Sequence, residues 1–134
     1  MVMNEDVQGG NETILLVDDD QIILDLTGAL LSGKGYKVLI ARDGVEALDT
    51  YRMSQKEIAL VLSDVGMPNL DGYSLLIKLK EMNPSIRVII WSGFFDKSLT
   101  SDLLKAGAMG YIEKPCSSTL LLKVLRESLD SAGA

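Results

Sequence analysis

The stretch that decides the fold is Ile14-Leu15-Leu16-Val17-Asp18-Asp19-Asp20, a short apolar run that ends in three consecutive carboxylates. An apolar run of this length between polar segments is typical of a buried strand. Three negative charges at its end repel one another, and a divalent cation is the usual compensation. The stretch therefore predicts a buried strand with a metal site at its carboxyl end.

The same pattern occurs a second time, with a basic counterpart later in the chain. Leu60-Val61-Leu62-Ser63 leads directly into Asp64, and Lys114 follows another apolar stretch. Magnesium prefers oxygen ligands, and a lysine ammonium binds phosphate as a point charge. Two acidic strand ends and one basic strand end therefore indicate a site for phosphate and magnesium.

Five short apolar segments alternate with segments of helical period. We expect strands at Thr13–Val17, Tyr36–Ala41, Ile58–Ser63, Ile86–Trp91 and Met109–Glu113. Each segment is apolar on both faces, as are the strands of a parallel sheet that helices cover on two sides. Five strand–helix units in 134 residues predict one α/β domain, a doubly wound five-stranded parallel sheet with right-handed crossovers.

Three of the helical segments carry apolar residues at the spacing of one face of an amphipathic helix. These residues are Ile22, Ile23, Leu26, Ala29 and Leu30 in the first segment, Leu75, Leu76, Leu79 and Met82 in the third, and Leu121, Val124, Leu125 and Leu129 in the last. Gly33 and Gly35 predict the end of the first helix, and Pro84 lies where the third helix has already stopped.

The composition excludes several classes of protein. The net charge of −6 argues against non-specific binding to nucleic acid or to an anionic membrane. No apolar run approaches the roughly 20 residues that span a bilayer, and the N-terminus does not resemble a signal peptide. The single cysteine, Cys116, fits the reducing cytoplasm. The absence of histidine excludes Ser-His-Asp catalysis, histidine-ligated zinc and a role as a phosphohistidine carrier.

The expected domain organisation is simple. We assign residues 1–12 to a flexible leader, residues 13–131 to the folded domain and residues 132–134 to a C-terminal tail, with no output domain. The sequence leaves three alternatives open: a stand-alone protein or phosphorelay shuttle, a piece of a larger regulator, or the terminal domain of a hybrid kinase.

Polar residues follow four of the predicted strands. Asp18, Asp19, Asp64, Ser92 and Lys114 each lie at or just after a strand end. In open α/β sheets, ligands bind beyond the carboxyl ends of the strands. We therefore expect these five side chains to meet at one edge of the sheet.

Four motifs together resemble the CheY-like receiver domains of two-component response regulators. They are the opening stretch, the run from Ser63 to Gly72, Ile89-Ile90-Trp91-Ser92-Gly93 and Gly110-Tyr111-Ile112-Glu113-Lys114-Pro115. The motifs occur in the order and at the intervals of that family, and the resemblance covers residues 13–130. It implies the flavodoxin-like (β/α)5 fold with strand order 2-1-3-4-5.

The resemblance assigns the chemistry to particular residues. It implies that Asp64 accepts a phosphoryl group from a phosphohistidine of a sensor histidine kinase or histidine phosphotransfer protein. Asp18, Asp19, Asp64 and the main-chain carbonyl of Gly66 would hold Mg²⁺. Asp20 is better placed to cap the following helix, where the helix dipole favours an acid.

Three further residues match the family's response to phosphorylation. The resemblance implies that Lys114, before a cis proline, and the hydroxyl of Ser92 contact the phosphate. It implies that Ser92 then moves and that the ring of Tyr111 rotates into the space it leaves. The face made by the fourth helix, fifth strand and fifth helix would change its affinity for a downstream protein, with homodimer formation on phosphorylation as one outcome.

Three positions depart from the family pattern. Gly66 and Phe94 flank the path of the water that hydrolyses the acyl phosphate, and our hypothesis is that Phe94 shields the phosphate and lengthens its lifetime. Cys116 replaces the usual aromatic residue after Lys-Pro and is interpreted as a small buried apolar residue. The leucines of the last two helices also exceed one buried stripe, which predicts either a wide core or an exposed partner surface. They are Leu99, Leu103, Leu104, Leu120 and Leu122.

Two other functions compete with the signalling one. A haloacid-dehalogenase-like aspartyl phosphatase also uses an aspartyl nucleophile, Mg²⁺ and a lysine, but it needs an acidic motif where this chain has Glu113-Lys114-Pro115. An unphosphorylated interaction module is the other alternative, although every acidic and switch position is chemically competent. We therefore expect a signalling receiver rather than an enzyme.

Overall fold

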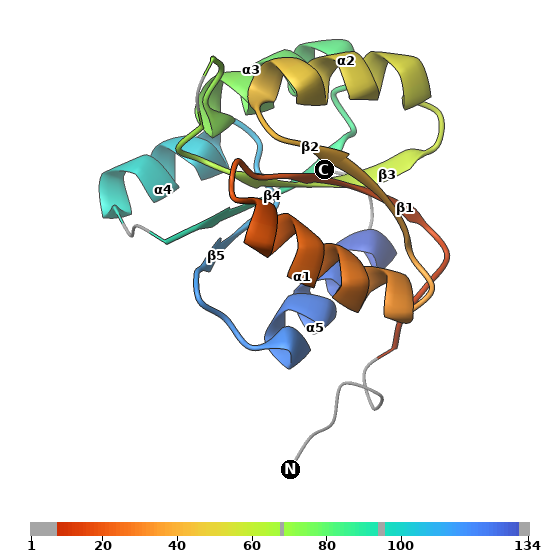
Figure 1. Cartoon of the computed structure of the whole chain (residues 1–134). Coiled ribbons are helices and arrows are strands. Elements are labelled where there is room, and N and C mark those ends of the chain that lie inside the picture. Colours follow the sequence, from red (N-terminus) through yellow and green to blue (C-terminus); the bar gives the residue numbers. More distant parts are fainter. Residues whose placement is uncertain (1–7, 68, 94–95, 132–134) are drawn as a thin grey trace.

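The structure is a computed structural model that describes residues 8–67, 69–93 and 96–131. Strands and helices alternate along the chain (Figure 1). In chain order they are β1 (Thr13–Val17), α1 (Gln21–Gly33), β2 (Lys37–Ala41), α2 (Gly44–Ser54), β3 (Ile58–Asp64), α3 (Gly72–Met82), β4 (Arg87–Ser92), α4 (Lys97–Lys105), β5 (Gly110–Glu113) and α5 (Ser118–Asp130).

The five strands form one parallel sheet in the order β2-β1-β3-β4-β5. The predicted fold is confirmed, and each predicted strand is correct to within one residue at either end. The register pairs Val17 with Ser63 and Asp64 with Trp91. The carboxyl ends of β1, β3 and β4 therefore lie next to one another.

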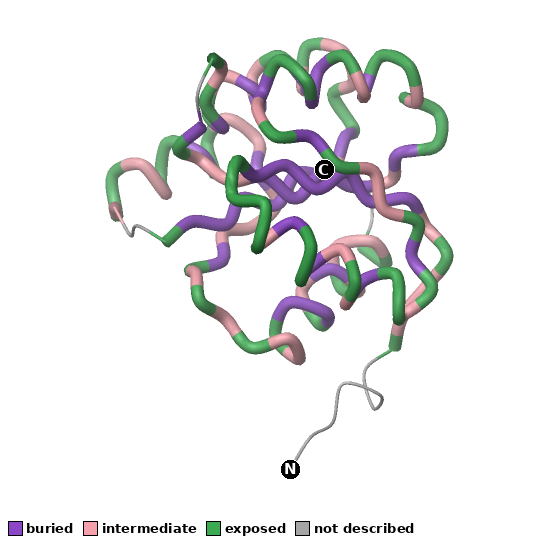
Figure 2. The backbone as a smooth tube through the Cα atoms, in the orientation of Figure 1, coloured by how far each residue is buried: buried purple, intermediate pink, exposed green. Residues whose placement is uncertain are grey.

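The sheet separates two apolar cores. Helices α2, α3 and α4 cover one face and helices α1 and α5 cover the other (Figure 1). Along β1, Leu15 and Val17 point into the first core, whereas Ile14 and Leu16 point into the second. Both faces of the central strands are buried, which explains their continuous apolar runs (Figure 2).

Each helix begins at a side-chain cap. The side chains of Asp20, Asp43, Asp71, Asp96 and Ser117 accept hydrogen bonds from backbone N–H groups in the first turns of α1 to α5. These bonds satisfy donors that a helix leaves without an internal partner. The predicted role of Asp20 as a helix cap is confirmed, and α1 ends at Gly33 as expected.

The predicted core face of α1 is correct only in part: Ile23 and Leu30 pack against the second core, but Ile22, Leu26 and Ala29 are exposed. Ile22 and Leu26 are 69% and 68% exposed, whereas Leu24, Thr27 and Leu31 are buried against the sheet. Apolar side chains occur around most of this helix, so their spacing fits more than one face. As a result, α1 presents an apolar surface outward.

The predicted faces of α3 and α5 are confirmed at their central positions. Leu75, Leu76 and Leu79 are fully buried on α3, and Leu121 and Leu125 are buried on α5. The expected surplus of apolar surface proves smaller than predicted, because Leu103 and Leu122 are also fully buried. Exposed leucines remain on both helices: Leu104 on α4 is 46% exposed and Leu120 on α5 is 48% exposed.

Part of the segment that we assigned to the leader contacts the domain. The N–H of Gly10 donates to the carbonyl of Lys34 at 3.1 Å, and the Arg126 guanidinium on α5 lies 2.6 Å from Glu12. Ordered contacts thus begin before β1. None of the described helices is long and apolar enough to cross a membrane.

Candidate functional site

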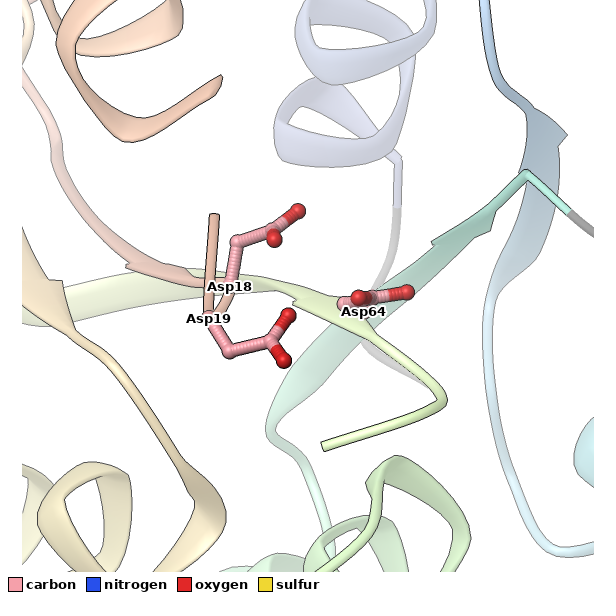
Figure 3. Close-up of side chains that lie close together, drawn as sticks. All are labelled: Asp18, Asp19 and Asp64. Carbon is pink, nitrogen blue, oxygen red and sulfur yellow. The ribbon is translucent and has the colours of Figure 1, made fainter. Parts of the chain in front are cut away.

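Three carboxylates converge at the carboxyl edge of the sheet. Asp18 and Asp19 follow β1, and Asp64 ends the neighbouring strand β3 (Figure 3). One oxygen of each carboxylate lies within 4.8 Å of the others. The sequence prediction that these three side chains meet is confirmed. Such a set of oxygen donors fits a hard divalent cation.

The two carboxylates that follow β1 lie in different environments. The N–H of Asp18 donates to the carbonyl of Ala41 on β2 at 3.1 Å, and Oδ1 of Asp18 accepts the N–H of Asp20 at 2.9 Å. The Asp18 side chain is only 1% exposed, whereas Asp19 is exposed. The Asp18 carboxylate is therefore fixed in place, and the Asp19 carboxylate is the one that solvent reaches.

Asp64 sits where β3 meets the start of α3. Its Oδ1 accepts the N–H of Val65 at 2.8 Å, and the N–H of Gly72 donates to the carbonyl of Val65 at 2.8 Å. A Cβ at position 72 would lie 2.3 Å from the Asp64 carbonyl oxygen, so only glycine permits this close approach. The pKa of the Asp64 carboxyl is raised above its ordinary value, chiefly by burial. The Lys114 ammonium opposes this rise, and the negative charge of Asp18 adds to it.

Lys114 brings the one ammonium group that pairs with these carboxylates in the described part of the chain. Its Nζ lies 2.5 Å from Oδ2 of Asp18 and 3.7 Å from Oδ1 of Asp64. It also lies 4.7 Å from the centroid of the Trp91 ring. Its backbone N–H donates to the carbonyl of Ser92 at 2.7 Å, and its peptide bond to Pro115 is cis. Lys114 therefore points into the site, as the resemblance implied.

Ser92 and Tyr111 flank the site on β4 and β5. Ser92 is the last residue of β4 and is buried, and Tyr111 pairs with Ile90 and packs against the core beneath α2, α3 and α4. Their roles in a conformational switch stay predictions.

Gly66 lies in the loop between β3 and α3. A Cβ added there meets nothing within 4 Å, so the space beside this residue is open. Its role as a main-chain metal ligand stays a prediction. Phe94, the subject of the shielding hypothesis, lies outside the described residues.

The structure adds two features that the sequence prediction missed. The Asn69 side chain donates to Oδ2 of Asp43 at 2.8 Å and fastens the loop after β3 to the start of α2. Asn69 has a φ of 68°, a conformation that asparagine tolerates better than most residues. Trp91 lies beside the Lys114 ammonium. No local sequence pattern predicts either contact, because each joins residues that are far apart in the chain.

Comparisons with known proteins agree on one family. A family model described as the response regulator receiver domain matches residues 14–126. The transcriptional regulatory protein ZraR of Klebsiella oxytoca is 37% identical over 123 residues, which are 92% of this chain and 27% of that protein. The sensor kinase CckA of Brucella abortus is 34% identical over 90% of this chain and 13% of its own length.

A solved structure shows the same fold. It is the CheX-CheY-BeF3-Mg complex from Borrelia burgdorferi, which is 27% identical, has a TM-score of 0.86 and covers 90% of each chain. The chain spans about a quarter or less of the length of the two curated relatives, which carry further sequence outside the match. Fold, site geometry and the match over residues 14–126 lead to one conclusion. The chain belongs to the receiver domain family of two-component response regulators.

Proposed function

We propose that this receiver accepts a phosphoryl group on Asp64 from a phosphohistidine, with Mg²⁺ bound beside it. The observation that carries the proposal is the meeting of Asp18, Asp19 and Asp64 with Lys114 at one edge of the sheet. A carboxylate oxygen attacks the phosphorus, the phosphorus–nitrogen bond of the donor breaks, and the imidazole leaves with the electron pair. The product is an acyl phosphate on Asp64.

The arrangement favours Asp64 over its neighbours as the nucleophile. Asp18 is almost fully buried and its Oδ2 is held by Lys114, so an incoming phosphoryl group cannot approach it freely. The side chain of Asp64 is 13% exposed and its nearest contact with the ammonium is longer, 3.7 Å. The ammonium is then close enough to stabilise charge on the transferred phosphoryl oxygens.

The proposed metal site consists of Asp18, Asp19, Asp64 and the carbonyl of Gly66. Three carboxylates face one ammonium, so the site has an excess of negative charge that a divalent cation balances. The bound ion would neutralise phosphoryl oxygens during transfer. The Borrelia burgdorferi relative is described with Mg and BeF3, which supports the same chemistry here.

The proposed output is a change on the α4–β5–α5 face. Ser92 ends β4 at the site, and Tyr111 on the next strand packs against the core. Phosphorylation would draw the Ser92 hydroxyl inward and let the Tyr111 ring move, shifting a two-state packing. Exposed Leu104 and Leu120 lie on the two helices of this face, where a downstream protein or a second copy would bind.

Intact-mass measurement tests the proposal directly. Incubation with acetyl phosphate and Mg²⁺ should add one phosphoryl group to the chain and none to Asp64→Asn. Asp25→Asn, which changes an exposed carboxylate of α1, is the matched control and should be phosphorylated normally. Absence of a phosphoryl adduct on the chain without substitutions would refute the proposal. Steady turnover of phosphomonoesters would favour the phosphatase alternative.

A further inference from the structure

Trp91 is a large side chain that the sheet places next to the reactive edge. It pairs with Asp64 on β3 and with Ile112 on β5. Side chains alternate between the two faces of a strand, and Trp91 and Ile112 both pack in the core covered by α1 and α5. Lys114 comes two residues after Ile112, so its side chain lies on the same face of the sheet as Trp91.

The Lys114 ammonium lies over the face of the Trp91 ring, 4.7 Å from the ring centroid. The negative face of an aromatic ring attracts a cation within about 6 Å, and tryptophan attracts it most strongly. The attraction is stronger where water is excluded, and here the Trp91 residue is 4% exposed and the Lys114 side chain 17% exposed. The contact therefore has both the geometry and the burial of an effective cation–π interaction.

Packing alone does not explain a tryptophan at this position. Its Nε1 is the one buried side-chain polar atom without a hydrogen-bond partner among the residues that the structure describes. A buried donor without a partner costs free energy, a cost that leucine or phenylalanine would avoid. What the indole adds over a leucine is the negative face of its ring, and the ammonium of Lys114 lies over that face.

The ring and the neighbouring carboxylate hold the ammonium in different ways. Oδ2 of Asp18 accepts a hydrogen bond from Nζ of Lys114 at 2.5 Å, which uses one of the three ammonium donors. The indole nitrogen is a donor only, so the ring attracts the charge without offering a nitrogen acceptor. The other ammonium donors stay available for oxygens beside Asp64, whose Oδ1 lies 3.7 Å away.

We propose that Trp91 is a positioning residue, whose ring face holds the Lys114 ammonium where it can contact the phosphoryl group on Asp64. The ring contact exists without phosphorylation, whereas its value for transfer rests on the proposed function. A ring with a weaker negative face leaves the ammonium to Asp18 and lowers its contact with the transferred oxygens. Trp91 acts on the rate through Lys114.

The first test measures the ring contact without phosphorylation. Trp91 is the only tryptophan of the chain, so fluorinated tryptophans supplied during expression change this ring alone. Fluorine weakens the negative ring face and leaves the ring shape nearly unchanged. With 5-fluorotryptophan and then 5,6-difluorotryptophan, the folding equilibrium constant from urea unfolding should fall stepwise. Lys114→Met keeps the length of the side chain without its charge and gives the reference series.

The comparison of the two series isolates the charge. The fall on difluorination should be about twofold larger in the chain with Lys114 than in Lys114→Met, a part of the full effect of a shielded cation–π contact. Equal changes in the two series would overturn the proposal, because fluorine would then act through packing alone.

The second test measures the rate and needs no substitution at Lys114. With acetyl phosphate and Mg²⁺, the difluorinated chain should be phosphorylated about two- to threefold more slowly than the chain with ordinary tryptophan, at a temperature where both are fully folded. Trp91→Phe should react about threefold faster than Trp91→Leu, although both variants remove the unpaired N–H and keep an apolar side chain. Equal rates for all rings, or a faster leucine variant, would overturn the proposal.

Failure of this inference is distinct from failure of the proposed function. If the chain with ordinary tryptophan forms no phosphoryl adduct, the proposed function fails, and the unfolding series still decides whether the ring holds the ammonium. If the adduct forms equally fast with every ring, the proposed function stands and Trp91 has no positioning role.

Discussion

Lys114 pairs more closely with Asp18 than with Asp64: its Nζ lies 2.5 Å from the first carboxylate and 3.7 Å from the second. The more deeply buried carboxylate thus has the closer counter-charge, which limits the cost of burying it. The Asp64 carboxylate keeps a weaker contact with the ammonium. One lysine therefore supports a buried acid and remains within reach of a phosphoryl group on its neighbour.

Removal of this ammonium should slow phosphorylation. We expect Lys114→Gln to reduce the rate with acetyl phosphate by roughly 10²-fold, the scale of losing one electrostatic contact to transferred oxygens. The pKa of Asp64 should rise further, because Lys114 lowers it in the intact protein. Intact mass over time and the carboxyl ¹³C shift of Asp64 measure the two effects. Lys105→Gln, an exposed lysine, is the control, and an unchanged rate in Lys114→Gln would contradict the assignment.

Ionised Asp64 should lower the stability of the domain. Burial raises its pKa in the folded state above the value in the unfolded chain, so the folded state loses stability as pH rises through the folded pKa. Asp64→Asn should therefore raise the free energy of unfolding at pH 7, and the gain should vanish below the pKa of an unfolded aspartate. Urea unfolding across pH measures this, with Asp25→Asn as control. A gain that is the same at every pH would contradict the explanation.

Magnesium should separate the roles of two adjacent acids. If the site binds Mg²⁺ only when folded, a concentration 100-fold above the dissociation constant should stabilise the domain by about 2.7 kcal/mol. Asp19→Asn should require at least about tenfold more Mg²⁺, because a charged oxygen ligand is lost. Asp20→Asn keeps the cap of α1 and should respond like the unmodified chain. Equal responses of the two variants would remove Asp19 from the metal site.

The sequence predicted the strands and the acidic edge well, because the signals there are local. A buried strand such as β1 is a continuous apolar run, and its end is marked by the residues that immediately follow. The face of α1 was predicted only in part because Ile22, Leu24 and Leu26 are all apolar, and only tertiary packing decides that Leu24 is the buried one of the three. The spacing of apolar residues cannot identify the buried face of a helix when most of its sides are apolar.

Contacts between residues that are far apart in the chain could not be predicted from the sequence, for a different reason. Arg126 and Glu12 are 114 positions apart, and Asn69 and Asp43 are 26 apart. Each partner alone reads as an ordinary surface residue. Their meeting follows from the strand order and loop paths, which only the folded chain specifies.

Arg126 should be a stability residue rather than a functional one. It donates to Glu12, to Asp130 and to the carbonyl of Gly9, and so joins the segment before β1 to α5. Arg126→Gln should cost roughly 1–3 kcal/mol of unfolding free energy, because the mostly buried guanidinium and its hydrogen bonds to the partly buried Glu12 are lost, while the bond to the exposed Asp130 contributes little. Arg52→Gln, which breaks the exposed pair with Asp49, should change stability by less than about 0.5 kcal/mol. Similar losses in the two variants would contradict this account.

The Arg126 contribution should also depend on pH. The hydrogen bonds from Arg126 hold the pKa of Glu12 below its ordinary value. A lowered folded pKa means that the stabilisation is complete above the pKa of an unfolded glutamate and is lost as pH falls through the folded pKa. The difference in stability between the unmodified chain and Arg126→Gln should therefore shrink on acidification. A difference that grows in acid would rule out this pairing as the cause.

The Asp43–Asn69 contact should matter for metal binding as well as for stability. Asp43 caps α2 by accepting the N–H of Glu46 at 2.8 Å, and it also accepts the Asn69 amide, so it joins α2 to the loop that contains Gly66. A Cβ at Gly44 would lie 2.4 Å from the carbonyl of Leu70, which shows how closely this loop approaches the helix. Asp43→Ala should lose the cap, at about 1 kcal/mol, and release the loop.

A second cap separates these two effects. Asp96 caps α4 through the N–H groups of Ser98 and Leu99, so Asp96→Ala should cost a similar amount of stability without touching the loop. If the loop positions the Gly66 carbonyl for Mg²⁺, Asp43→Ala should weaken Mg²⁺ binding several-fold and Asp96→Ala should not. Mg²⁺ titration followed by Trp91 fluorescence measures both affinities. Both variants lose a helix cap, but only Asp43→Ala releases the loop that contains Gly66. Equal Mg²⁺ affinities in the two variants would therefore mean that Asp43 stabilises α2 without positioning the Gly66 carbonyl.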